Sequence, residues 1–491
     1  MDNPDILIFM SDQHNALCGG FAGSSVVETP NLDKIAAQGT VFEAAYTSCP
    51  LCVPARMSML TGQLPSETGI FTNWGAIPED QSTFLHSLVA KGYETVLCGR
   101  MHFRGIDQRH GFTKRIMKDI TMGLWGKKDN KKNEKGIFSG TLGMNGCLNL
   151  IGGGTTSPVV EYDKAVIEKA VEYLKKEHNK PQCIVVGTYS PHFPYVAPVN
   201  LYKYYKKKVA LPSASENKTN YEQPLVQKKE QRFRTSAISG KKEKVDDEIK
   251  IRAKAAYYGM ITNLDRQIGK IKKCWEQYLE RNEKKGIFVY LSDHGDTIGE
   301  HNIFGKQTFY EGSARIPLIF NGEGIKKGKR IKGPVSIMDL GPTFCDIIDA
   351  KTLPEQDGES LVPNIFAGID NRERSVLSEF VELKSEIVPG RMIRKNNWKL
   401  ISYANNEEYD LLFDLKKDPD ELKNVLEHNT EKTAELKDIL KDDWKVNEII
   451  NDYKNKQKHL QLLPKWSENV DVMDQSEWTI PQRALKPPEV L

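Results

Sequence analysis

The sequence predicts an α/β protein: a large, mostly parallel sheet sandwiched by helices, with a smaller C-terminal α+β domain built on an antiparallel sheet. Three observations lead to this prediction. Several apolar runs are continuous rather than alternating, which indicates strands covered on both faces. Segments with a helical period separate these runs, as the crossovers of a parallel sheet require. Beyond residue 371 the pattern changes to short strands joined by turns and followed by a helix.

Four apolar runs of the chain each end in a cluster of polar residues. In open α/β sheets, ligands bind beyond the carboxyl ends of the strands, so we expect the four clusters to converge on one site. Residues 31–38 and 163–176 have the helical period of crossovers. The predicted strands cover residues 6–10, 93–98, 183–188 and 287–291, and the polar clusters cover residues 11–14, 99–102, 189–192 and 292–296.

Chain length and the change of pattern indicate two domains. With 491 residues, 39% of them hydrophobic, the chain exceeds the size at which single cores stop growing. We predict a catalytic α/β domain over residues 1–370, with a lysine-rich insertion at about residues 200–250 that we interpret as a mobile cover. Residues 371–491 are predicted to form the antiparallel-sheet domain, with a helix and an extended tail.

Smaller elements complete the predicted fold. We expect a strand at residues 317–320, a helix from Ser336 onward, and a flexible loop rather than a phosphate cradle at the glycine triplet 152–154. The run Asp-Pro-Asp-Glu at residues 418–421 is expected to introduce the C-terminal helix. The C-terminal strands are expected at residues 375–380, 391–393, 398–403 and 409–413.

The composition argues against several classes of partner. The 69 basic and 66 acidic side chains nearly cancel and leave a formal charge of +3, which argues against a nucleic-acid or anionic-membrane partner. No stretch approaches the roughly 18 apolar residues of a membrane span. The N-terminus has neither the basic region nor the long apolar region of a signal peptide. The chain as written is therefore expected to be cytoplasmic.

The most informative motif runs from Cys52 to Gly62 and reads Cys-Val-Pro-Ala-Arg-Met-Ser-Met-Leu-Thr-Gly. It resembles the signature of the type I sulfatases, C-x-P-x-R followed by T-G. The resemblance implies that Cys52 is oxidised after synthesis to formylglycine. In the hydrated aldehyde one hydroxyl attacks sulfur and expels the alcohol, and the other then loses a proton so that sulfate is eliminated. The competing interpretations are a buried structural cysteine and a redox or zinc pair of Cys49 with Cys52, for which no second pair exists.

A metal site is predicted at two of the strand ends. Asp12, Gln13, Asp293 and His294 are the candidate ligands. Their carboxylate and amide oxygens suit Ca²⁺ or Mg²⁺, and the imidazole indicates that Mn²⁺ would also be tolerated. Similar sulfatases bind one divalent cation, usually calcium, and the formylglycine oxygen, here from Cys52, completes its shell. Many family members have two aspartates where this chain has Asp12-Gln13, which leaves the identity of the metal open.

Five further residues match family positions. By resemblance Arg56 orients the diol, Arg100 stabilises the hydroxyl on the metal side, and His102 accepts the proton when sulfate leaves. His192 matches the histidine that protonates the leaving oxygen, and Lys306 neutralises a sulfate oxygen. The chain has Gly-Arg-x-His at residues 99–102, where sulfatases more often have Gly-Lys-x-His. Arg100 keeps the positive charge of the lysine, but its planar guanidinium group replaces the compact ammonium group.

The resemblance covers most of residues 4–430 and predicts a sulfuric ester hydrolase of the alkaline-phosphatase-like superfamily. The expected partners are a small-molecule sulfate ester of the aryl, steroid, choline or sugar class and a formylglycine-generating maturation enzyme, and homo-oligomerisation is left open. One alternative is a phosphonate monoester or phosphodiester hydrolase, some of which share the Asp-Gln pair, although Arg100 and His102 favour the sulfatase. A second is a catalytically silent protein that binds sulfated ligands.

The sequence leaves the roles of five side chains undecided. His301 either lines the pocket or hydrogen-bonds the loop that carries Lys306. Four aromatic residues near the motifs form either an aromatic wall of the substrate pocket or ordinary core. These residues are Trp74, Phe103, Trp125 and Tyr195.

Overall fold

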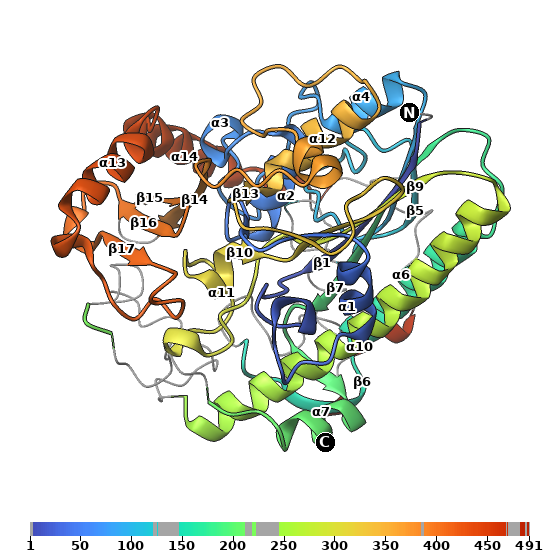
Figure 1. The fold of residues 1–491 in the computed structure, drawn as a ribbon, viewed down its shortest axis with the longest axis horizontal. Helices are drawn as coiled ribbons and strands as arrows, with labels where there is room; N and C mark the ends of the chain where they lie inside the picture. Colours follow the sequence, from blue (N-terminus) through green and yellow to red (C-terminus); the bar gives the residue numbers. More distant parts are fainter. Residues whose placement is uncertain are drawn as a thin grey trace.

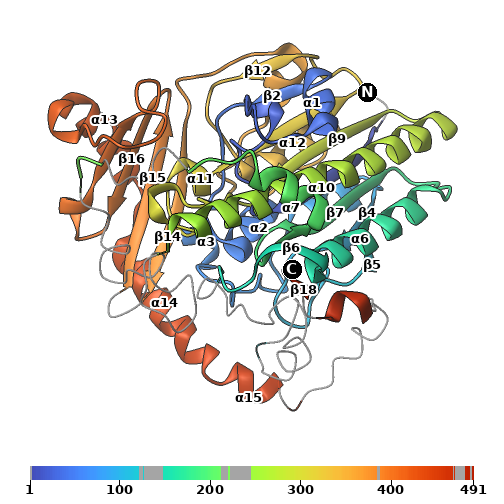
Figure 2. The ribbon, with the colours of Figure 1, turned by 90° about the horizontal axis from the view of Figure 1, so that it is seen from below.

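The computed structural model describes residues 3–120, 125, 147–211, 219–221, 245–383, 387–467, 469, 482–486 and 489–490. A central sheet with helices on both faces forms the larger part of the molecule, and a small sheet with two helices lies beside it (Figures 1 and 2). This arrangement confirms the predicted fold class. Within the described part of the chain, no helix combines the length and the apolarity that crossing a bilayer demands.

The central sheet has eight strands in the order β12-β2-β11-β9-β1-β7-β4-β5. The strands β9, β1, β7, β4 and β5 pair in parallel, whereas β11 is antiparallel to both of its neighbours. The bounds are β1 Asp5–Asp12, β2 Thr40–Phe42, β4 Glu94–Gly99, β5 Lys114–Met117, β7 Gln182–Pro191, β9 Gly286–Ser292, β11 Leu318–Gly322 and β12 Lys329–Ile331. All five strands predicted for this part of the chain are confirmed.

Alternate residues of the central strand β1 enter two separate cores. Ile6 and Ile8 face one core, and Leu7 and Phe9 face the other, as the two-residue period of a strand requires. The first core is closed by α2 Cys52–Thr61, α4 Phe84–Ala90 and α12 Leu340–Ile347. The second is closed by α1 Pro30–Ala37, α6 Pro158–Leu174 and α10 Asp247–Arg281. Figure 1 shows α4 and α12 on one side of the sheet and α6 and α10 on the other.

The C-terminal sheet is an antiparallel meander in the order β14-β15-β16-β17. Its strands are β14 Ser375–Leu383, β15 Ile387–Lys395, β16 Trp398–Tyr403 and β17 Leu411–Asp414, and two helices follow, α13 Thr430–Lys441 and α14 Val446–Leu460. Leu436 and Leu440 of α13 pack on Ile393, Leu400 and Leu412 of the sheet. The expected helix start at residues 418–421 is wrong, because that segment is a loop.

The loop at residues 418–421 has a structural role of its own, since it delivers Glu421 to a buried ion cluster. Lys399 of β16 lies 2.7 Å from a carboxylate oxygen of Glu421 and 3.0 Å from one of Glu311, at the start of α11 Glu311–Ala314. Tyr46 donates to Glu311 at 2.9 Å, and Arg394 of β15 donates to Tyr46 at 2.9 Å. The cluster therefore ties the C-terminal sheet to the larger part of the chain.

A third sheet corrects one prediction and relocates the tail. The glycine triplet belongs to β6 Ile151–Thr156, which pairs with β8 Tyr195–Pro198 and with β18 Glu489–Val490, so the prediction of a flexible loop is wrong. Just before β18, Arg483 forms ion pairs with Glu161 and Glu168 of α6. The end of the chain thus packs against the larger part of the molecule. The domain boundary near residue 370 stays a prediction.

The lysine-rich insertion is described only in part. Its first residues form α7 Val199–Lys206, and its last residues lead into α10. Residues 212–218 and 222–244 lie outside the described residues, as does the lysine run at residues 127–132. The interpretation as a mobile cover stays a prediction.

Candidate active site

The helix α2 begins at Cys52, so the motif places this side chain at a helix N-terminus. Val53 donates its backbone N–H to Oδ1 of Asn73 at 3.0 Å, which satisfies one of the amides that the first turn leaves unpaired. At the other end Gly62 has φ 74°, a left-handed conformation that favours glycine. The Thr-Gly end of the motif therefore terminates the helix, and its Cys-x-Pro-x-Arg start forms the first turns.

The sulfur of Cys52 is the point at which the predicted site residues meet. Nζ of Lys306 lies 2.8 Å from it, Nε2 of His294 lies 3.2 Å from it, and Oδ1 of Asp12 lies 3.9 Å from it. Burial and the Asp12 carboxylate raise the pKa of the thiol, but Lys306 and His294 outweigh them and hold it below its ordinary value. The arrangement therefore stabilises negative charge at this position.

The proposed metal ligands lie at the ends of two adjacent strands, Asp12 at the end of β1 and Asp293 and His294 after β9. One ligand atom from each of Asp12, Cys52, Asp293 and His294 lies within 4.8 Å of the others, and all four residues are buried. Gln13 is buried beside them, and its Oε1 has no hydrogen-bond partner among the described residues. This oxygen-rich set with one imidazole and an orphaned amide oxygen fits a divalent cation.

Two arginines surround the carboxylates. Arg56 donates from Nε to Asp293 at 2.8 Å and from a terminal nitrogen to Asp12 at 3.0 Å. Arg100 donates from Nε to the same oxygen of Asp12 at 2.5 Å. Burial raises the pKa of Asp12, but Arg100, followed by His192 and Arg56, outweighs it and holds the pKa well below its ordinary value. Arg56 was expected to orient the diol; the hydrogen bonds of its side chain brace the two carboxylates.

His102 is held by Arg100 and by a buried aspartate that sequence reasoning missed. Arg100 donates to Nδ1 of His102 at 2.8 Å, so the ring proton lies on Nε2. Asp119 accepts the backbone N–H groups of Met101 and His102, at 3.2 and 2.7 Å, and lies 3.4 Å from Arg100. Burial and the charges of Arg100 and Arg104 hold the pKa of His102 well below its ordinary value. The backbone of His102 is left-handed, with φ 61°.

His192 and Lys306 form a hydrogen-bonded pair. Nζ of Lys306 lies 2.9 Å from Nε2 of His192, and Nδ1 of His192 lies 2.7 Å from the carbonyl of Phe193. Because an ammonium only donates, Nε2 accepts and Nδ1 carries the ring proton. Burial and the charge of Lys306 hold the pKa of His192 well below its ordinary value. Nε2 of His192 therefore has no proton of its own and accepts a hydrogen bond from Lys306.

Two more aspartates position the site without touching the sulfur. Asp163 of α6 accepts the backbone N–H groups of Tyr189 and Ser190, at 2.6 and 2.9 Å, and so holds the segment before His192. Asp296 accepts Nε2 of Gln13 at 2.5 Å. Asp296 follows Asp293 within one polar cluster, a signal that sequence reasoning had in view. Asp119 and Asp163 have no such local signal.

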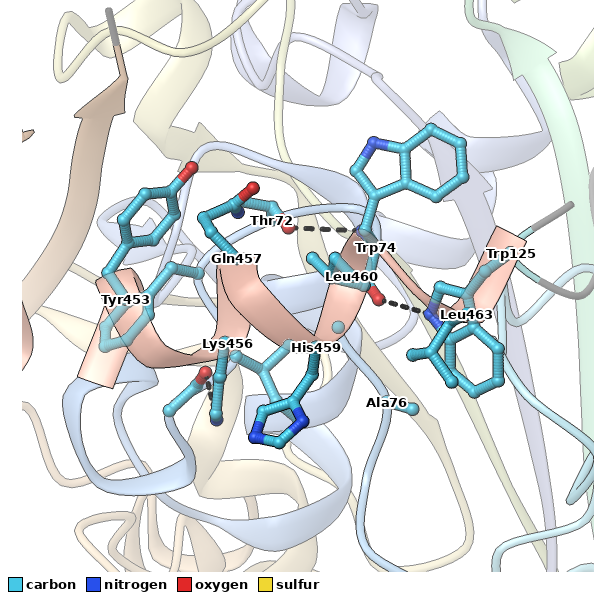
Figure 3. A pocket seen from close by; sticks show the side chains of 14 residues that line it. Thr72, Trp74, Ala76, Trp125, Tyr453, Lys456, Gln457, His459, Leu460 and Leu463 are labelled. Atoms are coloured by element: carbon cyan, nitrogen blue, oxygen red, sulfur yellow. Dashed lines mark hydrogen bonds between the residues drawn. The ribbon is translucent and has the colours of Figure 1, made fainter. Parts of the chain in front are cut away.

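Burial assigns the four aromatic residues, whereas the role of His301 stays a prediction. His301 is 3% exposed and stacks on Tyr310, with ring centroids 4.0 Å apart. Phe103 belongs to the first core, and Tyr195 is buried and donates to Asp296 at 2.6 Å. Trp74 and Trp125 instead line surface hollows, and Figure 3 shows the one against α14. All eight cysteines are free, Cys49 and Cys52 included.

Comparison with known proteins gives matches over most of the chain. A family model described as Sulfatase matches residues 4–350, and one described as N-sulphoglucosamine sulphohydrolase, C-terminal, matches residues 299–462. A choline-sulfatase of Rhizobium meliloti (strain 1021) is 32% identical over 436 residues, covering 87% of this chain and 83% of that protein. An arylsulfatase of Clostridium perfringens (strain 13 / Type A) is 29% identical over 473 residues, covering 89% and 93%.

Solved structures share the fold at lower identity. One, determined with its substrate D-glucosamine-2-N,6-O-disulfate, has a TM-score of 0.71 and 22% identity, covering 92% of this chain and 99% of that one. A phosphonate monoester hydrolase of Agrobacterium radiobacter has a TM-score of 0.66 and 20% identity, covering 94% and 95%.

Proposed function

Because the chain belongs to the sulfatase family, whose members are sulfuric ester hydrolases, we propose that it hydrolyses a sulfate monoester through a formylglycine made from Cys52. The observation that carries this proposal is the convergence on one sulfur of Lys306, His294 and Asp12, at 2.8, 3.2 and 3.9 Å. After oxidation of Cys52, the oxygen atoms bound to its Cβ would lie among these same three side chains. The hydrated aldehyde would supply a nucleophile that is regenerated in each turnover.

We further propose that Asp12, Gln13, Asp293 and His294 hold Ca²⁺, with Mg²⁺ and Mn²⁺ as the alternatives. When bound, the cation would polarise a sulfate oxygen and favour the ionised form of the attacking hydroxyl. Oδ2 of each aspartate is bonded to an arginine, and Oδ1 of Asp12 is directed at Cys52. The arginines therefore fix the orientation of the carboxylates and balance their charge.

The remaining residues divide between the sulfate and the leaving alcohol. Lys306 lies beside both the nucleophile position and His192, so it can neutralise a sulfate oxygen and also supply a proton. We propose that the leaving oxygen receives its proton from the Lys306–His192 pair, because Nε2 of His192 is already the acceptor of Lys306. Arg100 orients His102 beside the Asp12 carboxylate.

The test begins with the state of Cys52. In native protein, mass spectrometry should find the peptide that carries Cys52 lighter by about 18 Da, as replacement of the thiol by an aldehyde requires. Enzyme of known aldehyde content is then assayed with a panel of aryl, steroid, choline and sugar sulfates. It should release sulfate from at least one of these monoesters. An unmodified cysteine in active protein would overturn the formylglycine proposal, and an unmodified cysteine in inactive native protein would favour the silent binding protein.

The phosphonate hydrolase alternative deserves one direct comparison, since such enzymes share this fold. The basic pair Arg100 and His102 beside Asp12 favours the sulfatase. Specificity constants for nitrophenyl sulfate and for a nitrophenyl phosphonate monoester, measured on one preparation, decide between the two. A higher value for the phosphonate would replace the proposal.

A further inference from the structure

The strand β7 bulges away from its neighbours just before His192. Met10 of β1 lies opposite Gly187 of β7, but Asp12, two residues on, lies opposite Pro191, four residues on. This difference in length is that of a β-bulge. The pairing of β7 with β4 also ends at Gly187. Because buried N–H groups need acceptors, we expect acceptors from outside the two ladders for the residues between Gly187 and Pro191.

Asp163 of α6 supplies two of these acceptors. Its Oδ1 accepts the N–H of Tyr189 at 2.6 Å, and its Oδ2 accepts the N–H of Ser190 at 2.9 Å. The carboxylate is fully buried, and Pro191, the next residue of the chain, has no N–H. Each oxygen of Asp163 thus holds one of the last two amides before His192.

These two amides belong to a turn that ends at His192. The N–H of His192 donates to the carbonyl of Tyr189 at 3.1 Å, the bond that closes a four-residue turn. The rings of Tyr189 and His192 are in contact, with centroids 4.7 Å apart, and the guanidinium carbon of Arg100 lies 4.5 Å from the centroid of the same Tyr189 ring. A shift of Tyr189 would therefore displace the backbone and the ring that place His192 against Lys306.

The charge of Asp163 decides how firmly this turn is held. An ionised carboxylate accepts at both oxygens, whereas a protonated one has an O–H group that donates. Protonation therefore weakens the bond between one oxygen of Asp163 and the N–H that it faces, and a buried amide without a good acceptor is unfavourable. Only the ionised form holds both amides of the turn.

Asp163 changes its charge in an accessible pH range. Burial raises the pKa of Asp163 from 3.8 to about 6, although the N–H groups of Tyr189 and Ser190 lower it, and the charge of Asp12 on β1 raises it further. Burial also holds the pKa values of Tyr189 and of Tyr162, its neighbour on α6, well above their ordinary range, so both stay neutral. Asp12 stays ionised, because the surrounding cations hold its pKa well below the ordinary value.

We infer that Asp163 is a positioning residue for the proton donor of the leaving group. Its ionised carboxylate holds the turn that presents His192 to Lys306, and its protonation loosens this turn and slows delivery of the proton to the leaving oxygen. This inference rests on the proposed sulfatase function and adds a pH-dependent control to the same site. Esters that need the proton should respond to Asp163, and esters of good leaving groups should respond far less.

The pH dependence of the wild-type enzyme tests this inference without any substitution. The quantity is kcat/KM for an alkyl sulfate divided by kcat/KM for nitrophenyl sulfate, whose nitrophenolate leaves without protonation. Groups that act on both esters alike cancel in this ratio. The ratio should fall about tenfold between about pH 7 and about pH 5, the loss of ionised carboxylate for a pKa of about 6. A ratio that is constant over this range would overturn the inference.

Asp163→Asn mimics the protonated acid at every pH, because a side-chain amide accepts at one oxygen only. At neutral pH this variant should lower kcat/KM for alkyl sulfates by about 10- to 100-fold, the cost of a small misplacement in an active site. Nitrophenyl sulfate should lose far less. The ratio should no longer change with pH in this range. A ratio that still falls as in wild type would assign the fall to another group and overturn the inference.

Asp265→Asn is the matched control. Asp265 of α10 is buried too, and its carboxylate accepts the N–H groups of Asn31 and Leu32 at 3.1 and 2.8 Å. These bonds hold the start of α1 rather than the turn before His192. The control should keep the wild-type ratio and its pH dependence, and the same changes as in Asp163→Asn would overturn the inference. The wild-type measurement decides alone if Asp163→Asn does not fold.

A double variant separates the positioning of His192 from support of the whole site. Added to His192→Ala, Asp163→Asn should lower kcat/KM for alkyl sulfates by no more than about threefold further, because a residue that acts through another adds little once that other is lost. Multiplication of the two single losses would overturn the inference while the sulfatase function stands. Failure of aldehyde-containing wild-type enzyme to hydrolyse either ester would instead overturn the proposed function.

Discussion

The carboxylate of Asp296 accepts the side-chain amide of Gln13 at 2.5 Å, and this contact decides which end of the amide faces the catalytic centre. A carboxylate accepts but does not donate, so Nε2 must lie against Asp296 and Oε1 must lie on the other side. The same oxygen of Asp296 accepts the hydroxyl of Tyr195, and the other oxygen accepts the N–H of Gly305, directly before Lys306. Asp296 thus positions a candidate cation ligand and the lysine loop together.

The first prediction concerns this contact. Asp296→Asn should weaken Ca²⁺ binding by about 10- to 100-fold, the usual cost of losing a group that orients a ligand. Isothermal titration calorimetry on chelator-treated protein measures the affinity without reference to turnover. Asp349→Asn is the matched control, because that aspartate is fully exposed and pairs only with Lys91 among the described residues.

Unchanged affinity in Asp296→Asn would show that Gln13 is not a ligand. Full activity of metal-free wild-type protein, confirmed by elemental analysis, would remove the cation from the proposal altogether.

The second prediction concerns the nucleophile. Cys52→Ala should lower kcat for every sulfate ester by a factor of about 10⁴ or more, since nucleophile loss has costs of this size. Folding should be retained, because only a small side chain is shortened at a helix N-terminus. Sulfate release and the thermal unfolding midpoint are the two measurements. Residual activity above about a thousandth of wild type would contradict covalent catalysis through this position.

The third prediction concerns the Lys306–His192 pair. We propose that both residues deliver one proton to the leaving oxygen. Lys306→Met and His192→Ala should therefore both lower kcat/KM for alkyl and sugar sulfates by about 10²- to 10⁴-fold. Nitrophenolate leaves without protonation, so His192→Ala should slow nitrophenyl sulfate far less. The measurement is the dependence of log kcat/KM on the pKa of the leaving alcohol, which should steepen in both variants.

The double variant provides the control for this pair. Residues that act as one unit show non-additive losses, so Lys306→Met with His192→Ala should be scarcely slower on alkyl sulfates than Lys306→Met alone. If the double variant is instead slowed by the product of the two single-variant factors, the two residues act on different oxygens.

The fourth prediction concerns the ion cluster between the two sheets. Burial raises the pKa of Glu311, but Lys399, followed by Arg315 and Arg394, outweighs it and lowers the pKa from 4.5 to about 2. A carboxylate with a lowered folded-state pKa contributes stability that is full above pH 4.5 and is lost as the pH falls through about 2. Lys399→Met should therefore lower the free energy of unfolding by about 3–5 kcal/mol at neutral pH, and the deficit should shrink below pH 4.5.

Urea unfolding of wild type and variant at several pH values measures this deficit. Lys169→Met is the matched control, since its side chain is 52% exposed and it pairs with the exposed Glu172. A Lys399→Met deficit that is independent of pH would show that lost packing, rather than the charge of Glu311, causes it.

Much of the site could be predicted from short stretches of sequence. The run from Cys52 to Gly62 is contiguous, and the helix that it forms begins and ends within it. The candidate ligands Asp12, Asp293 and His294 lie at or directly after the ends of apolar strands, and the carboxyl ends of neighbouring parallel strands meet at one edge of a sheet. Local pattern was therefore enough to bring these side chains together.

Other features depended on partners that the sequence does not mark. The glycine triplet at residues 152–154 is a strand because β8, more than 40 residues later, pairs with all three glycines, and β18, more than 300 residues later, pairs with Gly154. Nothing in the sequence distinguishes Asp119 from other acidic residues in loops. Its contacts with Arg100 and with the N–H of His102 are visible only in the structure.

The sequence by itself determined the class of enzyme and predicted the nucleophile and the cation ligands, because contiguous motifs and apolar runs encode them. Only the tertiary structure decided that Arg56 braces carboxylates, that Lys306 donates to His192, and that Asp296 turns the amide of Gln13. These contacts join residues between 44 and 283 positions apart. Their geometry follows from the order of strands and the packing of two cores, which no local pattern specifies.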